Sequence, residues 1–340
     1  LIVTQKVDKN DPILGFFHRW IEEFAEHVEF LTIVCLEEGT HSLPKNVKVL
    51  SLGQEKGRSR FKYLFRFYKY IWNERRNYDC VFIHMNQEYI ILGWKFWRLM
   101  SKKIFLWRNH AKGSLLTRLA VLFSNKVFYT SPQSFTARFK KGIIMPVGID
   151  TNFFKPDLST TRKPNSILFL GRISPVKRVG VFIYALKDLR DKKINFSVTI
   201  AGASSAKDLG YEKMIRDKVL QYGLDDMVRF VGAVNQVGAL QLYREHEVYV
   251  NLTPSGSMDK TIFEAMSSGA IVVSSNVFFK DVLPSTLMPK EGDTHDIAIK
   301  IENIFSLKEG EKKMVTNIST EYSKTQAVQN TVNSIMYELK

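Results

Sequence analysis

The sequence predicts an α/β protein of two Rossmann-like domains, each a doubly wound parallel sheet, that face each other across a cleft. Short apolar strands alternate with longer helical stretches, a pattern typical of parallel sheets with helices on both faces. The alternation breaks once, over residues 141–156, and then restarts. A length of 340 residues also fits two domains of about 150 residues better than one.

The first half is a series of apolar runs separated by helical or polar stretches. Amphipathic spacing predicts helices over residues 16–28 and 58–76. Apolar runs rich in β-branched and aromatic residues predict strands over residues 1–5, 30–37, 46–52, 81–85, 103–107 and 126–130.

The second half repeats this pattern after a break that contains Pro146, Gly148 and Pro156. The predicted elements are strands at 166–171, 196–202, 227–234, 247–254 and 270–276, and helices at 176–189, 235–246, 261–268 and through the tail from 294. We therefore expect one domain over residues 1–150 and another over 151–320, with a helix at about 320–340 free to pack back on the first.

Composition limits the possible partners. Lys and Arg number 49 against 34 Asp and Glu, a net charge of +15, which suits an anionic partner such as nucleic acid, an anionic membrane or a phosphate-bearing small molecule. The two cysteines, Cys35 and Cys80, follow or open apolar runs and indicate buried free thiols. The chain opens on a strand rather than a secretory signal, and no apolar run approaches the roughly 20 residues of a membrane span. We expect a reducing, cytoplasmic setting with only peripheral membrane contact.

A cluster of cations follows the first strand of the second domain. The run GRISPVKR places Gly171, Arg172, Lys177 and Arg178 between this strand and a predicted helix. The glycine lets the backbone turn, and paired cations suit a diphosphate. A solvated turn with surface charges explains the run equally well, so the spacing alone leaves both interpretations open.

A Gly/Ser loop at residues 255–259 opens the helix that contains Glu264. Free N–H groups at a helix start are able to hold a phosphate. Glu264 has the apolar neighbours Phe263, Ala265 and Met266, and a carboxylate on such a helix needs a partner, which a ribose diol supplies. The simpler alternative is a partly exposed pair with Lys260, one helical turn earlier.

These two segments together resemble the GT4-type family of retaining glycosyltransferases, which have the GT-B fold. The matching residues are G-R-I-S-P-V-K-R after one strand and S-x-D-K-T-I-F-E-A-M-S-S-G-A before another. The segment P-V-G-I-D-T-N-F-F at 146–154 resembles the family's interdomain segment. The resemblance implies an N-terminal acceptor domain and a C-terminal nucleotide-sugar donor domain.

The resemblance also implies roles for single residues. Arg172 and Lys177, next to Gly171, would hold the donor diphosphate and steady the leaving group, while Glu264 would bind the ribose hydroxyls. His110, within the weaker match W-R-N-H, would lie near the transferred sugar. The other implied donor contacts are Lys260, Thr261 and Ile262 at the phosphate or sugar, Ser257 in the loop, and Val231 where the base rests.

One departure from the family pattern concerns the donor sugar. Family members often have two glutamates separated by seven residues, and Gly256 stands where the first would be. Ser255, Ser257 and Asp259 are candidates to replace it, so the sequence does not define the sugar.

The stretch 58–76 interleaves aromatic residues with Arg and Lys. Phe61, Leu64, Phe65, Tyr68 and Trp72 have helical spacing and predict an apolar face that packs on the sheet. The basic face of this helix is then expected to meet anionic lipid headgroups. A purely structural helix with solvated cations is the alternative.

The resemblance therefore implies a retaining hexosyltransferase that uses a UDP- or GDP-linked sugar and a lipid-linked or glycan acceptor. We expect it in the cytoplasm, peripherally bound to the inner face of the plasma membrane, with no cofactor and no required metal ion. A basic nucleic-acid-binding protein is a second hypothesis, although no helix-turn-helix, zinc-finger or RRM signature is visible, and we expect no nucleic acid partner. A nucleotide-sugar epimerase of the same fold is a third.

Overall fold

The computed structural model describes residues 1–57, 59–157, 159–255 and 258–339. The chain forms two compact units: the first consists mainly of Leu1–Gly148 and the segment from Ala327 on, and the second of Ile149–Ser255 and Asp259–Gln326. The first unit thus ends at Gly148 rather than at 150, and the chain returns to it at Ala327 rather than at 320.

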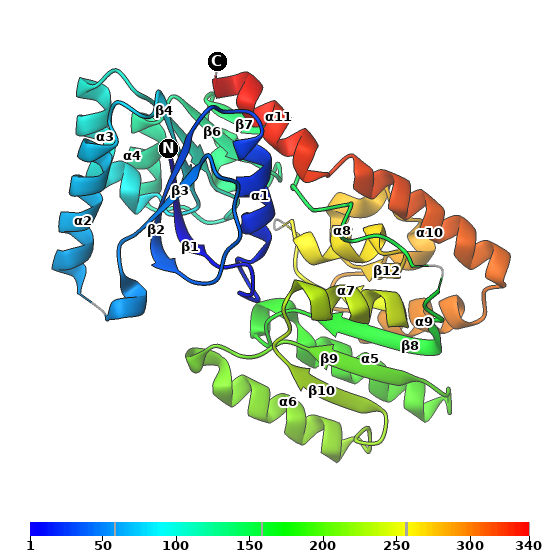
Figure 1. The fold of residues 1–340 in the computed structure, drawn as a ribbon. Helices are drawn as coiled ribbons and strands as arrows, with labels where there is room; N and C mark the ends of the chain where they lie inside the picture. The colour runs from blue at the N-terminus through cyan, green and yellow to red at the C-terminus, as the bar shows by residue number, and fades with distance from the viewer. Residues whose placement is uncertain (58, 158, 256–257, 340) are drawn as a thin grey trace. The chain divides into compact units, whose positions relative to one another are not determined.

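The first unit is built on a parallel sheet with the strand order β3-β2-β1-β4-β5-β6-β7 (Figure 1). The strands β1 to β6 match the expected ones to within a few residues, which confirms the alternating pattern. Their bounds are β1 Ile2–Val7, β2 Leu31–Glu38, β3 Val47–Ser51, β4 Cys80–His84, β5 Lys103–Trp107, β6 Lys126–Tyr129 and β7 Gly142–Ile144.

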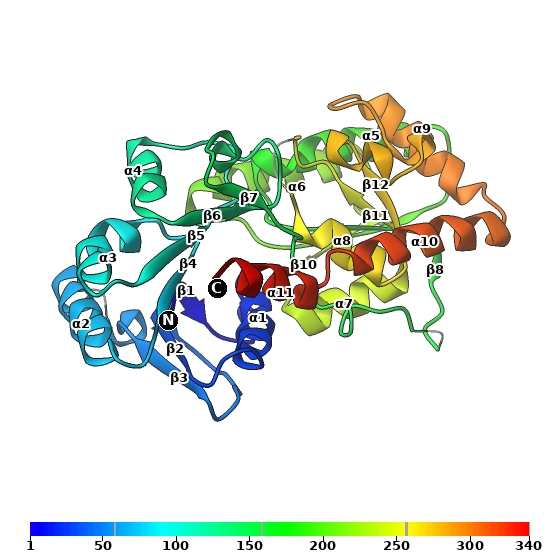
Figure 2. The same cartoon turned by 90° about the horizontal axis from the view of Figure 1, so that it is seen from above.

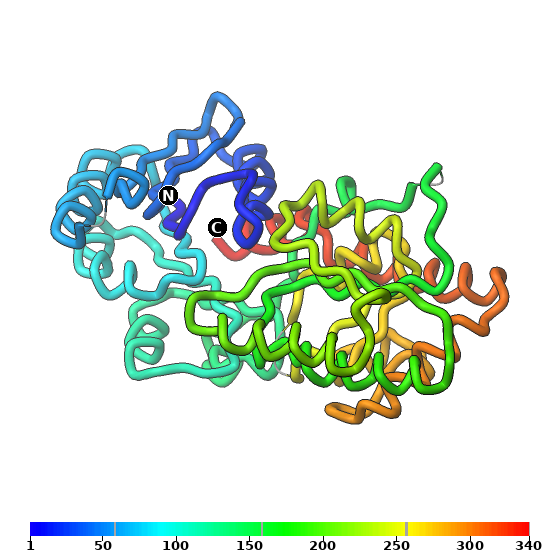
Figure 3. The backbone as a smooth tube through the Cα atoms, turned by 90° about the horizontal axis from the view of Figure 1, so that it is seen from below, coloured from blue at the N-terminus to red at the C-terminus, as the bar shows by residue number. Residues whose placement is uncertain are grey.

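Helices cover both faces of this sheet, each over a separate apolar core. One face lies under α1 (Phe16–Ala25) and the last helix, α11 (Val328–Leu339), which pack against each other. Figures 2 and 3 show α11, at the red end of the colour scale, beside α1. The other face lies under α2 (Arg60–Asn73), α3 (Glu88–Leu99) and α4 (Leu115–Phe123).

The predicted packing face of α2 is wrong. Phe67 and Ile71 are the buried side chains of this helix, and Phe67 packs against the ring of Trp97 in α3. Phe61 and Phe65, assigned to the sheet from their spacing, are 88% and 71% exposed. The helix has apolar residues on most of its circumference, so helical spacing alone did not distinguish the packed stripe from the exposed one.

The second unit contains a parallel sheet with the order β10-β9-β8-β11-β12. Helices cover both faces, with α5, α6 and α9 on one and α7, α8 and α10 on the other (Figure 1). The strands are β8 Lys163–Leu170, β9 Ser197–Ala201, β10 Val228–Gly232, β11 His246–Asn251 and β12 Ile271–Ser274. The helices are α5 Val179–Asp191, α6 Leu209–Gln221, α7 Gln236–Glu245, α8 Lys260–Ser267, α9 Thr294–Phe305 and α10 Glu309–Lys324.

Both sheets have the doubly wound order, which confirms the predicted fold class of two parallel-sheet α/β domains. The short strand β7 lies inside residues 141–156, where the predicted alternation breaks, and the helices α4 and α6 were not predicted. Residues Gly142–Ile144 form a strand because they pair with β6, and the local sequence does not reveal this pairing.

Candidate functional site

The second sheet reverses its strand order between β8 and β11. Ligands of open parallel sheets bind outside the carboxyl ends of strands, at such a reversal point. The GRISPVKR loop follows β8, and the loop that opens α8 follows β11. The fold therefore brings together the two segments that the sequence singled out.

Glycines shape the backbone next to this point. Gly171, directly after β8, has φ +155°, and Gly202, directly after β9, has φ +141°. A Cβ atom on Gly202 would lie 1.9 Å from the carbonyl oxygen of Gly171. Backbone hydrogen bonds join the loops, with Gly171 N–H donating to Ala201 at 2.9 Å and Gly202 N–H to Gly232 at 2.7 Å. These hydrogen bonds hold the carboxyl ends of β8, β9 and β10 close together.

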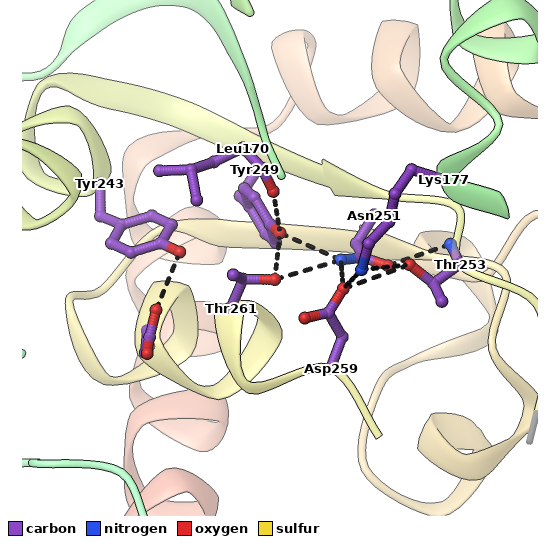
Figure 4. Close-up of polar contacts among 9 residues, drawn as sticks. Leu170, Lys177, Tyr243, Tyr249, Asn251, Thr253, Asp259 and Thr261 are labelled. Carbon is purple, nitrogen blue, oxygen red and sulfur yellow. Dashed lines mark hydrogen bonds and ion pairs between the residues drawn. The ribbon is translucent and has the colours of Figure 1, made fainter. Parts of the chain in front are cut away.

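Lys177 lies in a short 3₁₀ turn after β8, and its ammonium group points at the loop after β11 (Figure 4). It forms an ion pair with Asp259, the residue before α8, and donates a hydrogen bond to Thr253 Oγ1 at 3.2 Å. The Lys177 and Asp259 side chains are 17% and 13% exposed. The sequence predicted Lys177 as a diphosphate-binding cation, but did not predict that an aspartate neutralises it in the ligand-free protein.

Oxygen Oδ2 of Asp259 is the centre of a small polar network. Besides Lys177, it accepts hydrogen bonds from Asn251 Nδ2 at 3.0 Å and Thr253 Oγ1 at 3.2 Å. Burial opposes ionisation of this carboxyl, but the Lys177 charge and the hydrogen bonds prevail and lower its pKa to about 2. Asp259 is therefore ionised at neutral pH and holds the Lys177 side chain in place.

A second set of contacts fixes the first turn of α8 (Figure 4). Tyr249 donates its hydroxyl hydrogen bond to Thr261 Oγ1 at 2.7 Å, and its hydroxyl lies 3.2 Å from the carbonyl oxygen of Leu170. Asn251 Nδ2 lies 3.0 Å from the Tyr249 hydroxyl. Sequence analysis missed Tyr249, Asn251 and Thr253, although alternate polar residues at the end of an apolar strand are a signal for such a network.

Glu264 is buried on α8, with 8% of its surface exposed. Its Oε2 accepts a hydrogen bond from the Tyr243 hydroxyl at 3.2 Å, a partner that the sequence did not reveal. Burial raises the pKa of Glu264 and lowers that of Lys260, while the attraction between the two charges opposes both shifts. Among the described residues, no hydrogen bond to Oε1 of Glu264 is present, so this oxygen is available to a ligand such as a diol.

The remaining predicted donor residues have different surroundings. Arg172 is exposed at the end of β8 and forms no ion pair with any described residue. Thr261 belongs to the Tyr249 network, whereas the Ile262 side chain is buried and its amide donates to the Asp259 carbonyl at 3.2 Å. Val231 is half-buried on β10, the edge strand, and Ser257 lies outside the described residues.

The predicted catalytic histidine belongs to the first unit. His110 is exposed in the loop after β5, and its carbonyl accepts a hydrogen bond from Phe135 N–H at 2.9 Å. His84, at the end of β4, is buried, stacks on Phe17 at 3.9 Å between ring centroids, and lies 3.2 Å from Thr4 Oγ1. His84 is thus a packed structural residue of the first unit.

Chemically, the site in the second unit combines cations, a helix start and a carboxylate. Arg172 and Lys177 supply positive charge, and the positive end of the α8 dipole adds to it. The Asp259 side chain does not cap this helix. Glu264 lies one turn further on, so the arrangement suits a ligand with a polyanionic group and a hydroxylated group.

Two further properties of the described residues bear on function. They include no group of three or more His, Cys, Asp or Glu side chains suited to hold a metal ion. No helix within residues 1–57, 59–157, 159–255 and 258–339 has both the length and the apolar character that crossing a bilayer requires.

Sequence comparison identifies related proteins. Residues 150–319, half of the chain, match the family model described as glycosyl transferases group 1. The lipopolysaccharide core biosynthesis mannosyltransferase LpsB of Rhizobium meliloti (strain 1021) is 21% identical over 264 residues, 72% of this chain and 73% of LpsB. The D-inositol 3-phosphate glycosyltransferase 2 of Catenulispora acidiphila is 28% identical over 142 residues, which is 38% of this chain and only 33% of that enzyme.

Structure comparison extends the similarity to the whole chain. The crystal structure of HepE from Anabaena, solved in complex with UDP and glucose, superposes with a TM-score of 0.76 and covers 99% of this chain and 98% of HepE. Sequence identity over this match is 16%, so it establishes a shared fold.

Proposed function

We propose a specific reaction for this chain, which belongs to the group 1 glycosyl transferases and is therefore a glycosyltransferase enzyme of the GT-B fold. The reaction moves a hexosyl group from a UDP- or GDP-linked sugar to a lipid-linked or glycan acceptor, at the cytoplasmic face of the membrane. It retains the anomeric configuration, as the resemblance to the GT4-type enzymes implies, and it requires no cofactor and no metal ion.

One observation carries this proposal: Lys177, from the loop after β8 that also contains Arg172, pairs with Asp259 at the start of α8, where the second sheet reverses its strand order. A nucleoside diphosphate sugar has a diphosphate for the cations and the helix start, and a ribose diol for Glu264. HepE, which shares the fold, was crystallised with UDP and glucose, and this supports a UDP-linked donor.

The same residues account for the chemical step. The bond between the sugar carbon and the diphosphate oxygen breaks, and the bond to the acceptor oxygen forms. Lys177 and Arg172 would stabilise the negative charge that develops on the departing diphosphate. The acceptor hydroxyl passes its proton to the leaving phosphate oxygen, so the reaction balances without a carboxylate pair, which glycosidases use. His110 is proposed to contact the transferred sugar.

A thermal-shift panel with UDP, GDP, ADP, NAD and a short RNA tests the donor site. We expect one nucleoside diphosphate to raise the melting temperature of the wild type, because a ligand that binds only the native state stabilises it. Glu264→Ala should lose most of this shift, since it removes the proposed diol partner. The matched variant Glu245→Ala, beside Lys163 at the opposite, amino edge of the same sheet, should keep it. Stabilisation by RNA alone, equal in all three proteins, would refute the proposal.

Turnover tests the diphosphate residues separately. The double variant Arg172→Ala with Lys177→Ala should lose release of nucleoside diphosphate from the donor, whereas Arg229→Ala on the exposed part of β10 should not. Wild-type rates in the double variant would show that the diphosphate binds elsewhere. Release that does not require an acceptor would favour the epimerase alternative.

The membrane part of the proposal rests on the outer surface of α2 and α3. Helix α2 contains four cations and no acidic residue, and it exposes Phe61, Phe65 and Trp72. The half-buried Tyr68 of α2 contacts the exposed Phe96 of α3 at 5.1 Å between ring centroids, so the two helices form one continuous surface. Exposed apolar side chains among cations are typical of helices that lie on anionic membranes.

Co-sedimentation with liposomes tests this surface. Wild-type protein should bind vesicles that contain an anionic lipid, less strongly as salt is added, because screening weakens surface attraction. Phe61→Ser with Phe65→Ser should reduce binding, while Leu220→Ser should not, although Leu220 on α6 is also an exposed apolar residue. Equal binding to neutral vesicles would show that the cations play no part.

A further inference from the structure

The carboxyl edge of the first sheet contains buried polar atoms that lack hydrogen-bond partners among the described residues. Leaving such an atom unpaired costs about 1–3 kcal/mol, so each one calls for a physical explanation. Four of them follow the neighbouring strands β4, β5 and β6: Gln87 Oε1, Arg108 Nε, Thr130 Oγ1 and Ser134 Oγ. We call these four residues the Arg108 cluster.

Backbone contacts hold the segments of the Arg108 cluster together. Arg108 directly follows β5, and its amide donates to the Phe128 carbonyl of β6 at 2.9 Å. Its own carbonyl accepts a hydrogen bond from Thr136 Oγ1 at 2.9 Å, two residues beyond Ser134. The Thr130 amide donates to the Asn109 side chain at 3.1 Å. Gln87 follows β4, which pairs with β5, and its amide donates to Met85 at 3.1 Å.

Arg108 also lacks a counter-ion. Its side chain is half-buried and forms no ion pair within the described part of the chain. Burial lowers the pKa of its guanidinium, with Glu88 opposing at longer range, so the position disfavours an unpaired cation. Gln87, Thr130 and Ser134 are 5%, 2% and 1% exposed. Ordered water is able to satisfy their oxygens, whereas an anion would in addition neutralise the charge of the half-buried guanidinium.

We propose that the Arg108 cluster binds an anionic group, a phosphate ester or a carboxylate, on the acceptor saccharide. The guanidinium of Arg108 pairs with the anion. The hydroxyls of Thr130 and Ser134 donate to it, and Gln87 Oε1 accepts from a neighbouring sugar hydroxyl. This inference rests on the proposed transferase function, and it narrows the acceptor from any glycan or lipid-linked sugar to an acidic one.

Thermal-shift titrations with glucose 6-phosphate, glucuronate and neutral glucose test the proposal. The variants are Arg108→Gln, Ser134→Ala and the control Arg98→Gln, an exposed arginine on α3. Each titration is repeated in Lys177→Ala, which separates this site from the donor site in the second unit. We expect at least one acidic sugar to stabilise the wild type, Arg98→Gln and Lys177→Ala, and glucose to have no effect. Arg108→Gln should bind that sugar about tenfold more weakly or worse, equivalent to about 1.4 kcal/mol.

The ligand-free proteins provide a second measurement. Ser134→Ala removes an unpaired buried hydroxyl and Arg108→Gln an unpaired cation, so neither should lower the melting temperature, whereas residues with a structural role would. Stabilisation by glucose 6-phosphate alone indicates a phosphate ester, and by glucuronate alone a carboxylate. The proposal is overturned if neither sugar stabilises the wild type, or if Arg108→Gln binds as the wild type does. If UDP does not raise the melting temperature of the wild type, the proposed donor site is contradicted instead. Arg108→Gln should show the same UDP-induced shift as the wild type, because Arg108 lies outside the donor site.

Discussion

Asp259→Asn is the most informative single change in the donor site. The substitution keeps the size of the side chain but removes the charge that pairs with Lys177. The pKa of Asp259 lies at about 2, below the ordinary 3.8. A tenfold change in proton affinity corresponds to about 1.4 kcal/mol, so the ionised carboxylate contributes about 2 kcal/mol to the free energy of unfolding at neutral pH. We expect Asp259→Asn to lose about this amount, a fall of about 4–8 °C in melting temperature.

The same variant should respond more strongly to UDP. In the wild type the donor diphosphate must compete with Asp259 for Lys177, whereas in Asp259→Asn no other carboxylate of the described residues pairs with the ammonium group. We expect the dissociation constant for UDP to fall by up to about tenfold, measured by calorimetry. The control Asp226→Asn, in an exposed turn before β10, should change neither stability nor affinity. Weaker UDP binding in Asp259→Asn would refute this reasoning and show that Asp259 itself helps to bind the donor.

Three further predictions concern pH, packing and catalysis. Because the pKa of Asp259 is depressed in the folded state, the stability that its carboxylate contributes is present above about pH 4 and is lost as pH falls towards about 2. In urea titrations, the free energies of unfolding of the wild type and Asp259→Asn should therefore converge over that pH range. Gly148→Ala should lower the free energy of unfolding by about 1–3 kcal/mol, because Gly148 has φ +75° and a Cβ atom there would lie 2.2 Å from the buried Trp20 ring. Gly210→Ala on α6, where a Cβ atom meets no neighbour within 4 Å, should not lower it. His110→Ala should lower kcat for transfer but leave the UDP-induced thermal shift intact, because His110 belongs to the first unit; a lost shift would contradict its assignment to the sugar-transfer step.

The sequence by itself determined the order of elements and the fold class. Strand and helix periodicities are local properties, so β1 to β6 and β8 to β12 were predictable from short windows. The GRISPVKR loop and the start of α8 were also visible, because a glycine, several cations and a helix start are close in sequence. That these two segments lie close together was expected from the general rule that the carboxyl ends of parallel strands share one edge of the sheet, and not from the residues themselves.

Only the tertiary structure decided which side chains meet. Lys177 and Asp259 are 82 positions apart, and Tyr243 lies 21 positions before Glu264, so no local pattern relates them. The exposed stripe of α2 and the packing of α11 on α1 likewise depend on which surfaces the sheet and its neighbours cover. The Arg108 cluster became visible for the same reason: burial and missing partners are properties of a packed chain, and a sequence lists donors and acceptors without showing which of them are satisfied.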